Sequence, residues 1–543
     1  MRLASYGYGE KLSPVGFPEL VAKGNQIDFR RSWPPIEEWY VNEPAGLEQG
    51  FTLPSPPPAK FDGERLRLAM EVTGDLTAEL AEGGQSVSLK HSNGDVILTY
   101  GELHAFDAQG RELPSQMLVR QGHVLLEVDD DQAVYPVTID PTFTQQVNLR
   151  SSDGARNDNF GHAVAISGNV VVVGAPYDDV GTRADQGSAY VFLRSNGVWS
   201  QVAKLTATDG AAGDNFGSSV AIRWDTIVVG ARYDDAGPNA DLGSAYVFFR
   251  TGPAWANWTQ QAKLVPSIAG SNDHFGTSVA IDAYTGNTVV VGAPDDDISF
   301  NNQGSAYVFV RSGTTWNQQQ RLIASDGGTG AQFGYSVAVE AFTLGTIVVG
   351  APSDDIDSKA DQGSVYVFFR SNGAWIQQPK LVASDGEAGD AFGFSVATSM
   401  PGSRIVVGAP GDNIIANANQ GSAYVFQRST GFPYAFQAKL LAGDGAAGDS
   451  FGSSAAISGY EVVLGAPNDD TGLNVNQGSA YNFVCNGACV QSQKLGASNG
   501  ATSDWFGNSV AVDPAATSPI VVGSPFKDLL SNSNQGSAYL FLR

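Results

Sequence analysis

Short apolar runs alternate with turn-forming residues over most of the chain, and the pattern recurs. In one unit, the predicted strands cover residues 218–222, 226–229, 244–250 and 258–264. The second strand of each unit is continuously apolar, as at 170–173, and most of the third is too, as at 189–193. Apolar runs this short indicate strands that are buried on both faces. The fourth strand is mostly polar, so each unit predicts a four-stranded sheet with that strand outermost.

Three landmarks mark seven copies of this unit. The first is a Phe-Gly pair, at Phe160, Phe216, Phe275, Phe333, Phe392, Phe451 and Phe506. The second is Gly-Ala-Pro or a close variant, beginning at Gly174, Gly230, Gly292, Gly350, Gly408, Gly465 and Gly523. A Gly-Ser-Ala-Tyr segment or close relative follows each time, as at Gly187 and Gly243. Seven four-stranded units predict an all-β fold, a seven-bladed β-propeller.

The ends of the array predict how the ring closes. The seventh unit stops at Arg543, directly after its third strand. The segment 143–149 precedes Asp153-Gly154 in the same way that Lys204-Leu205 precedes Asp209-Gly210. We therefore expect residues 143–149 to supply the missing fourth strand, which would remove two sheet edges. The propeller domain is predicted to cover residues 143–543.

The first 142 residues lack the repeat. Residues 1–49 contain Pro34-Pro35 and are predicted to be irregular and only partly β. From about Arg65 onward, short alternating segments are separated by turn signals such as Asn93-Gly94. We predict a small domain resembling a β-sandwich over residues 50–142.

Charge and composition exclude several classes of protein. The chain has 31 basic and 56 acidic residues and a net charge of -25, which argues against a nucleic-acid binder that neutralises phosphates. No run of 18 apolar residues occurs, so no transmembrane segment is expected. The five histidines show no metal-ligand spacing, and no Gly-x-Ser-x-Gly or His-Glu-x-x-His motif is present. The protein is therefore not expected to be an enzyme. The alternative is a lyase or hydrolase acting on polysaccharides, with His162 and Tyr335 near the propeller axis.

The Phe-Gly and Gly-Ala-Pro landmarks resemble the FG-GAP repeat of integrin alpha-subunit propellers and of secreted or surface bacterial proteins. The resemblance covers residues 143–543, with departures at Arg232 and Ser524, which stand where the motif has proline and alanine. It implies an extracellular or cell-surface binding and adhesion scaffold, with a passive structural ring as a further alternative. The segment 38–50 is similar to a module that precedes such repeats in bacterial secreted proteins. No signal peptide is visible, so we expect the natural N-terminus to lie further upstream.

The calcium loops that such repeats often carry are not matched here. Acidic residues instead recur two residues before six of the seven Phe and after Gly-Ala-Pro, in links that emerge at the same face of a meander. Two interpretations stay open: the side chains bind Ca²⁺, or they accept backbone N–H groups and shape turns. The metal candidates are Asp178, Asp179, Asp185, Asp234, Asp235, Asp241, Asp354, Asp355 and Asp361.

Positions that differ between the repeats are candidates for ligand binding. Aromatic and arginine side chains gather at these positions in units seven, one and two, which become neighbours once the ring closes. Exposed aromatic and arginine side chains are typical of binding hot spots. We expect a protein or glycan partner to bind at Tyr177, Arg183, Arg232, Tyr233, Trp505 and Phe526.

The two cysteines flank an Asn-Gly turn signal. Cys485 and Cys489 lie on either side of Asn486-Gly487, with apolar residues outside them. Cysteines that face each other across a hairpin turn can form a disulfide. We expect that bond, and with it an oxidising compartment outside the cytosol.

Overall fold

The computed structural model is all-β, and its described residues contain no helix. It describes residues 1–16, 18–23, 26–32, 35–43, 46–58, 60, 63–80, 86–90, 96–109, 111–120, 122–144, 146–195, 198–252, 255–268, 270–340, 345–399, 404–428, 433–513, 519–529 and 532–541. Two compact units are present, and each is described by itself. None of the described segments forms a helix that is long and apolar enough to span a membrane.

The N-terminal unit consists of two antiparallel sheets. The five-stranded sheet has the order β11-β12-β7-β1-β2, and the eight-stranded sheet has the order β3-β4-β5-β6-β13-β10-β9-β8. The strands are β1 (Arg2–Tyr8), β2 (Lys11–Pro14), β3 (Glu19–Lys23), β4 (Gln26–Ser32), β5 (Pro35–Glu43), β6 (Gly46–Leu53), β7 (Leu66–Glu71), β8 (Thr77–Leu80), β9 (Val87–Lys90), β10 (Val96–Phe106), β11 (Ser115–Arg120), β12 (His123–Val128) and β13 (Val137–Thr144).

One core joins the two sheets of this unit. Leu3, Leu68 and Met117 from the first sheet and Phe51 and Tyr100 from the second belong to a single buried cluster. The unit is therefore a β-sandwich. The expected boundary at residue 49 differs from the structure, because β1 to β5 supply strands to both sheets. Pro35 does not interrupt these strands, since it begins β5 opposite Ser32, where a missing N–H is tolerated.

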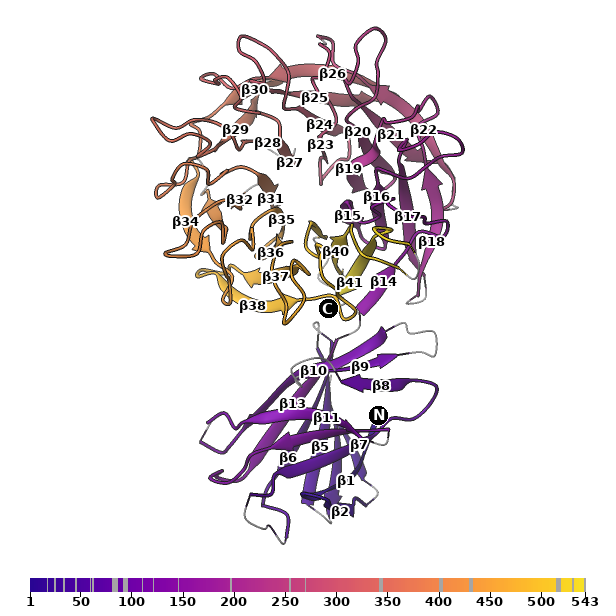
Figure 1. Ribbon diagram of the computed structural model, residues 1–543, viewed down its shortest axis with the longest axis vertical. Helices are drawn as coiled ribbons and strands as arrows, with labels where there is room; N and C mark the ends of the chain where they lie inside the picture. The colour runs from indigo at the N-terminus through magenta and orange to yellow at the C-terminus, as the bar shows by residue number, and fades with distance from the viewer. Residues whose placement is uncertain are drawn as a thin grey trace. The chain divides into compact units, whose positions relative to one another are not determined.

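The second unit is a ring of seven four-stranded antiparallel sheets (Figure 1). The inner strands are β15 (Ala163–Ser167), β19 (Phe216–Arg223), β23 (Ser278–Ile281), β27 (Ser336–Glu340), β31 (Ser395–Thr398), β35 (Ser454–Ser458) and β39 (Ser509–Val512). The second strands are β16 (Val170–Ala175), β20 (Thr226–Ala231), β24 (Thr288–Ala293), β28 (Thr346–Ala351), β32 (Arg404–Ala409), β36 (Glu461–Ala466) and β40 (Ile520–Ser524). The third strands are β17 (Ser188–Ser195), β21 (Ser244–Arg250), β25 (Ser305–Ser312), β29 (Ser364–Ser371), β33 (Ser422–Gln427), β37 (Ser479–Val484) and β41 (Ser537–Phe541). The outer strands are β18 (Val198–Leu205), β22 (Trp258–Leu264), β26 (Thr315–Leu322), β30 (Ala374–Gln377), β34 (Ala435–Leu440), β38 (Val490–Leu495) and β14 (Gln146–Leu149).

Burial follows the predicted pattern. The second strands are buried along almost their whole length, as in β20, whereas β22 is mostly half-buried. Phe216 lies in a buried cluster that joins blades one and two, and its ring meets Tyr246 and Phe248 edge-on at centroid distances of 5.5 and 5.9 Å. Each blade thus covers the next one, which explains why the second and third strands are apolar on both faces.

The landmark glycines allow the blades to approach each other backbone to backbone. A Cβ on Gly174 would lie 2.0 Å from the carbonyl oxygen of Gly217 in the next blade. The Phe216 N–H donates to the carbonyl of Gln186 across the same junction at 2.9 Å. The same bond from the Phe N–H recurs at every junction, including Phe160 to Gln535 between the first and last blades. The Phe-Gly pair is therefore the point at which neighbouring blades are joined.

The seventh sheet has the order β14-β41-β40-β39, so a strand that precedes the first repeat completes the last blade. That strand is shorter than the expected 143–149, because Phe143 and Thr144 end β13, where they pair with β10. Ser509 Oγ also donates to the Gly161 carbonyl at 2.9 Å, which links blade seven directly to blade one.

Candidate functional site

The two acidic rows occupy the links that enter the inner strands and the links between second and third strands. These links emerge at the same face of an antiparallel meander. They also touch across the blade junctions, as where the Asn215 N–H donates to the carbonyl of Asp185. The first row lies two residues before the Phe in six blades, and Ala331 takes this place in blade four. Asp158 is 2 % exposed, and its carboxylate accepts the Ala155 N–H at 2.6 Å. Burial raises the pKa to about 6 at Asp158, Asp214, Asp273, Asp390 and Asp449.

The second row pairs with a basic residue of the outer strand. Asp178 is 3 % exposed, and its Oδ2 lies 2.7 Å from Lys204 Nζ and accepts the Tyr190 hydroxyl at 3.1 Å. Lys204 also contacts Asp153, at 2.6 Å. The arrangement recurs in five further blades, in the pairs Asp234–Lys263, Asp296–Arg321, Asp354–Lys380, Asp412–Lys439 and Asp469–Lys494. These six buried aspartates are therefore neutralised inside the protein, whereas the carboxylates next in sequence, such as Asp179, are exposed.

The carboxylates next in sequence shape turns. Asp179 Oδ1 accepts the Asp185 N–H at 2.9 Å, and Asp185 has a φ of 53°, in the left-handed region. Asp235 and Asp241 repeat this bond at 2.9 Å, and Asp355 and Asp361 repeat it at 3.0 Å. This is the turn-shaping interpretation of the acidic links.

The nine calcium candidates do not fit a cation site in this arrangement. An ammonium group already occupies the coordination space of Asp178, Asp234 and Asp354. The carboxylates that follow them are bonded to backbone N–H groups. Among the residues that the structure describes, no group of three or more His, Cys, Asp or Glu side chains is arranged to hold a metal ion.

Blade seven departs from this scheme. Lys527 replaces the buried aspartate after Gly-Ala-Pro, and Asn148 replaces the lysine of the outer strand. Lys527 Nζ donates to Asp504 Oδ2 at 2.9 Å and to the Asn499 carbonyl at 2.6 Å.

The recurring Ala-Lys-Leu of the outer strands was the sequence signal for the pairs between aspartate and lysine in the other blades. Sequence reasoning did not connect the lysine with the aspartate.

The residues before each Phe share one strained backbone conformation while their side chains differ. Their φ values lie between 52° and 57°, in the left-handed region, for Asn159, Asn215, His274, Gln332, Ala391, Ser450 and Trp505. Side chains at these positions meet those that follow Gly-Ala-Pro in the same blade. In blade seven, the half-buried rings of Trp505 and Phe526 pack edge-to-face with centroids 4.8 Å apart.

Arg232 and Tyr233 lie in blade two, but they connect to blade three. The Arg232 guanidinium lies 4.8 Å from the centre of the Tyr233 ring, and the Tyr233 ring meets His274 edge-on at 5.0 Å. His274 Nδ1 is 2.6 Å from Asp295 Oδ2, and the other oxygen of Asp295 accepts Gln332 Nε2 at 3.2 Å. Sequence reasoning missed this polar chain, although all of its members are repeat-variable positions.

The charge of Arg232 acts on the pKa values of two residues near the start of the inner strands. His162 follows Phe160 by two residues, and burial together with Arg232 lowers its pKa to about 4. Burial raises the pKa of Tyr335, and Arg232 opposes that rise. Arg232 Nε is itself buried and has no hydrogen-bond partner within the described chain. His162 is therefore neutral at pH 7 beside an arginine that is not fully satisfied.

The remaining two candidates lie in blade one. Tyr177 is half-buried, and Arg183 is exposed and donates to Gln186 Oε1 at 3.3 Å within its own turn. Among the described residues, neither side chain makes a ring contact or a hydrogen bond with Arg232 or Trp505. The structure thus brings Trp505 into contact with Phe526, and Arg232 into contact with Tyr233. In the described part of the chain, Arg183 contacts neither pair and bonds only within its own turn.

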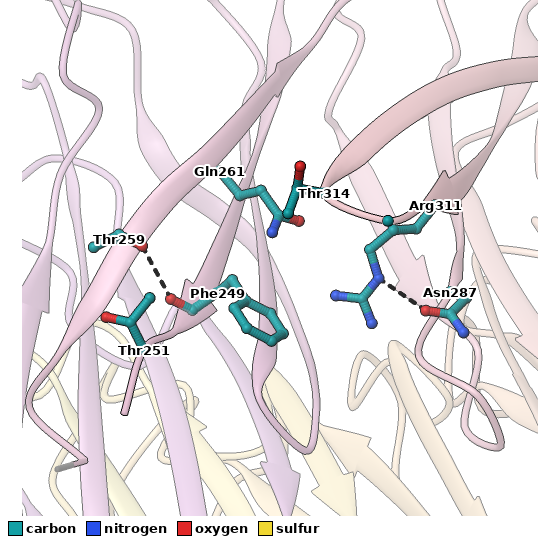
Figure 2. A pocket seen from close by; sticks show the side chains of 8 residues that line it. Phe249, Thr251, Thr259, Gln261, Asn287, Arg311 and Thr314 are labelled. Atoms are coloured by element: carbon teal, nitrogen blue, oxygen red, sulfur yellow. Dashed lines mark hydrogen bonds between the residues drawn. The ribbon is translucent and has the colours of Figure 1, made fainter. Parts of the chain in front are cut away.

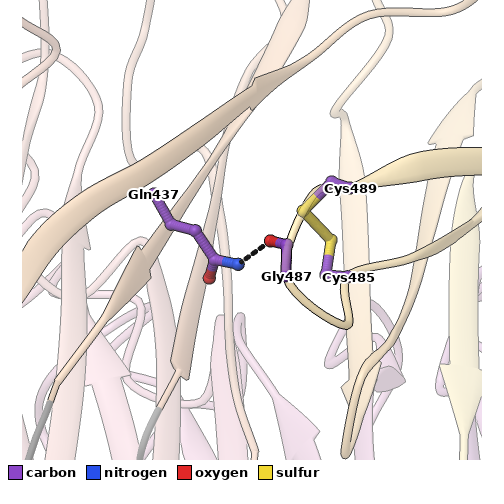
Figure 3. The surroundings of a disulfide bond; sticks show 4 residues. All are labelled: Gln437, Cys485, Gly487 and Cys489. Carbon is purple, nitrogen blue, oxygen red and sulfur yellow. Dashed lines mark hydrogen bonds between the residues drawn. A yellow bond between two sulfur atoms is a disulfide. The ribbon is translucent and has the colours of Figure 1, made fainter.

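The two cysteines form a disulfide across the turn between β37 and β38 (Figure 3). Cys485 is fully buried, and Gly487 at the turn has a φ of 92°. The Gly487 carbonyl accepts Gln437 Nε2 at 2.8 Å, so the turn is anchored to blade five.

The fold defines this chain as a seven-bladed β-propeller protein. A family model described as the FG-GAP repeat matches seven segments, at residues 143–192, 199–248, 258–309, 316–368, 375–426, 434–483 and 489–541. The chain belongs to the FG-GAP repeat family. Among solved structures it is similar to the WD40 repeats of RRP9, with a TM-score of 0.45 and 10 % identity over 73 % of this chain and 97 % of that one. No curated protein matches the sequence.

Proposed function

We propose that the propeller is an extracellular binding module that captures a protein or glycan at the face carrying Trp505, Phe526, Arg232 and Tyr233. One observation carries the proposal. Trp505 occupies a position where the backbone has the same left-handed φ in every blade but the side chain differs. Tyr233 and Phe526 stand at the position after Gly-Ala-Pro, where the side chain also differs, and Arg232 replaces the proline of the other blades. The blade does not require them, and such side chains are the ones that dominate binding hot spots.

Preorganisation supports the same proposal. The left-handed backbone of Trp505 and the ring contact with Phe526 hold the indole in place, and Arg232 is held over Tyr233. Side chains that are fixed before binding lose less entropy when a ligand arrives. The disulfide and the FG-GAP family are typical of proteins outside the cell, which supports an extracellular setting.

The test compares the protein with a variant that carries Trp505→Ala, Tyr177→Ala and Tyr233→Ala on a glycan array and on a panel of purified extracellular-matrix proteins. Tyr284→Ala, at a half-exposed ring in the β23–β24 link of the opposite face, is the matched control. We expect captured ligands to be lost only from the triple variant, with melting temperatures unchanged. An identical profile for all three proteins would favour a passive ring. Release of new reducing ends from acidic polysaccharides would favour the enzyme alternative.

A further inference from the structure

A pocket of about 600 Å³ lies between the outer parts of blades two and three (Figure 2). Its lining comes from β21, β22, β25 and the links beside them, namely Phe249, Thr251, Thr259, Gln261, Asn287, Arg311, Gly313 and Thr314. These links join first to second and third to fourth strands, so they emerge at the face opposite to the proposed ligand surface. The volume is in the usual range for small-ligand pockets, roughly 300–1,000 Å³.

Arg311 is held rigidly at the side of this pocket. Its Nε donates to Asn287 Oδ1 at 2.8 Å, and its Nη1 donates to the buried Thr226 hydroxyl of blade two at 3.1 Å. The guanidinium also lies 5.3 Å from the ring centres of both Phe249 and Trp316. Two of its five N–H groups are used by these bonds, and the others are left for a ligand.

In blade two, the arginine equivalent to Arg311 has a carboxylate partner that Arg311 lacks. The equivalent residue there is Arg250, whose Nε and Nη2 contact Asp225 Oδ1 at 2.7 and 2.5 Å. Asn287 stands at the place of Asp225, so Arg311 has no carboxylate partner within the described chain. Asn169 takes this place in blade one, but no aromatic ring lies under Arg194 among the described residues, so that guanidinium is not fixed in the same way.

The amides around the pocket are oriented as donors. Trp316 Nε1 can only donate, and it bonds to Gln261 Oε1 at 2.8 Å, which leaves Gln261 Nε2 free of any acceptor in the described chain. The bond from Arg311 to Asn287 Oδ1 likewise turns Asn287 Nδ2 away from the guanidinium. Figure 2 shows Gln261, Phe249 and Arg311 directed toward the same space. A cation and the amide donor of Gln261 thus face a pocket that supplies no carboxylate.

We propose that this pocket binds a sugar that bears a carboxylate, a hexuronate, with Arg311 holding the carboxylate. Charge-assisted bonds from a fixed guanidinium to a carboxylate are the strong ones among protein hydrogen bonds. The hydroxyls of Thr251 and Thr259 donate to the carbonyls of Asn257 and Phe249 and keep lone pairs that can accept from sugar hydroxyls. The Thr314 hydroxyl can both donate and accept. Phe249 provides an apolar surface for the ring. The nearby carboxylate of Asp225 is already held by Arg250 and does not compete.

The experiment titrates the full chain with glucuronate and with glucose by calorimetry at pH 7. Four proteins are compared: the wild type, Arg311→Gln, Asn287→Asp and Arg194→Gln. Asn287→Asp recreates the blade-two pair and gives Arg311 an internal carboxylate without removing any side chain that supports the fold. Arg194→Gln removes the equivalent arginine from blade one, leaves the pair of Arg250 with Asp225 intact, and serves as the control.

We expect glucuronate to bind the wild type and Arg194→Gln alike, and glucose to bind at least tenfold more weakly. Both Arg311→Gln and Asn287→Asp should lose about tenfold to hundredfold in affinity. Melting temperatures identify a variant that has failed to fold, and Asn287→Asp then carries the test alone. The proposal is overturned if glucuronate does not bind the wild type, if glucose binds equally well, or if Asn287→Asp retains full affinity. Because the pocket and the proposed ligand face are separate, losing one leaves the other intact.

Discussion

Lys527 Nζ donates to Asp504 Oδ2 at 2.9 Å, and both side chains are more than nine-tenths buried. In six other blades, the residue at the place of Lys527 is an aspartate that is paired with a base from the outer strand. Blade seven draws its outer strand from β14, which has Asn148 at that place. The charge reversal at Lys527 therefore compensates for a base that the closing strand does not provide.

Removing Lys527 should destabilise the propeller strongly. In Lys527→Met, the carboxylate of Asp504 would stay buried without its cation, which costs about 3–5 kcal/mol. The double variant Lys527→Met, Asp504→Asn should recover most of that loss, because no buried charge is left. Chemical unfolding measures both. Lys359→Met is the control, since its pair with Glu387 is largely exposed and is worth at most about 1 kcal/mol. Equal losses in Lys527→Met and Lys359→Met would contradict the argument.

The buried aspartates that precede the Phe in six blades should make stability fall as the pH rises. The pKa of Asp214 is raised by burial from 3.8 to about 6, so the folded state holds this proton more tightly than the unfolded chain. Its contribution is complete below about pH 4 and is lost as the pH rises to about 6. Asp214→Asn should raise the melting temperature at pH 7 and leave it unchanged near pH 4. Asp235→Asn, at an exposed turn position, should show no such difference.

A second set of carboxylates acts in the opposite direction at lower pH. Burial acts to raise the pKa of Asp209, but its hydrogen bond with Lys263 outweighs burial and holds the pKa below 3.8. Stability from this pair is present above about pH 4 and is lost as the pH falls through the lowered pKa. Scanning calorimetry of the wild type should therefore find the highest melting temperature between about pH 4 and pH 5. A maximum at or above pH 7 would show that the buried aspartates are not the dominant groups.

The close approach of Gly174 and Gly217 should make Gly174 intolerant of any side chain. An alanine Cβ would meet the Gly217 carbonyl at 2.0 Å, so two blades would have to separate. We expect Gly174→Ala to cost about 3 kcal/mol, at the upper end for overpacked sites. Gly328→Ala is the control, because nothing lies within 4 Å of its added Cβ. That change should be neutral or stabilise by up to about 1 kcal/mol through the unfolded chain.

The disulfide should contribute modestly because it closes a very short loop. The separation of four residues between Cys485 and Cys489 corresponds to about 2 kcal/mol in the chain-entropy model. Cys485→Ala, Cys489→Ala should lower the free energy of unfolding by about that amount. Wild-type protein treated with a thiol reductant should match the double variant. A loss above about 5 kcal/mol would show that the bond does more than restrict the unfolded chain.

Local pattern was enough to predict the blades, because each strand is short, apolar and bounded by fixed landmarks. The third and fourth strands of blade two were predicted at 244–250 and 258–264, which are the bounds of β21 and β22. The pairing of Asp178 with Lys204 was not predictable in the same way. The two lie 26 positions apart in sequence, and they meet only because the register sets Lys204 opposite Tyr190, which bonds to Asp178.

The N-terminal unit shows the limit of turn signals. The prolines at 34 and 35 predict an irregular segment, whereas Pro35 is the first residue of β5 and pairs with Ser32 of β4. Proline ends a strand in sequence-based reasoning, but it is also tolerated as the first residue of one. Likewise, the repeat-variable side chains could be found from the sequence, but the connection from Tyr233 to His274 and Asp295 depends on the spacing of two blades.

The place of β14 in the seventh sheet also constrains how the molecule is made. On the ribosome, β14 emerges before the seven repeats, while its partner β41 emerges after all the other strands of the ring. Six blades can assemble as they appear, but the ring stays open until β41 emerges. Throughout that time, β14 has no partner from its own sheet, and the edge of the growing stack is unprotected. Truncated chains that lack β41 would keep this unpaired strand permanently, so ring closure gives quality-control proteins a structural difference between complete and incomplete chains.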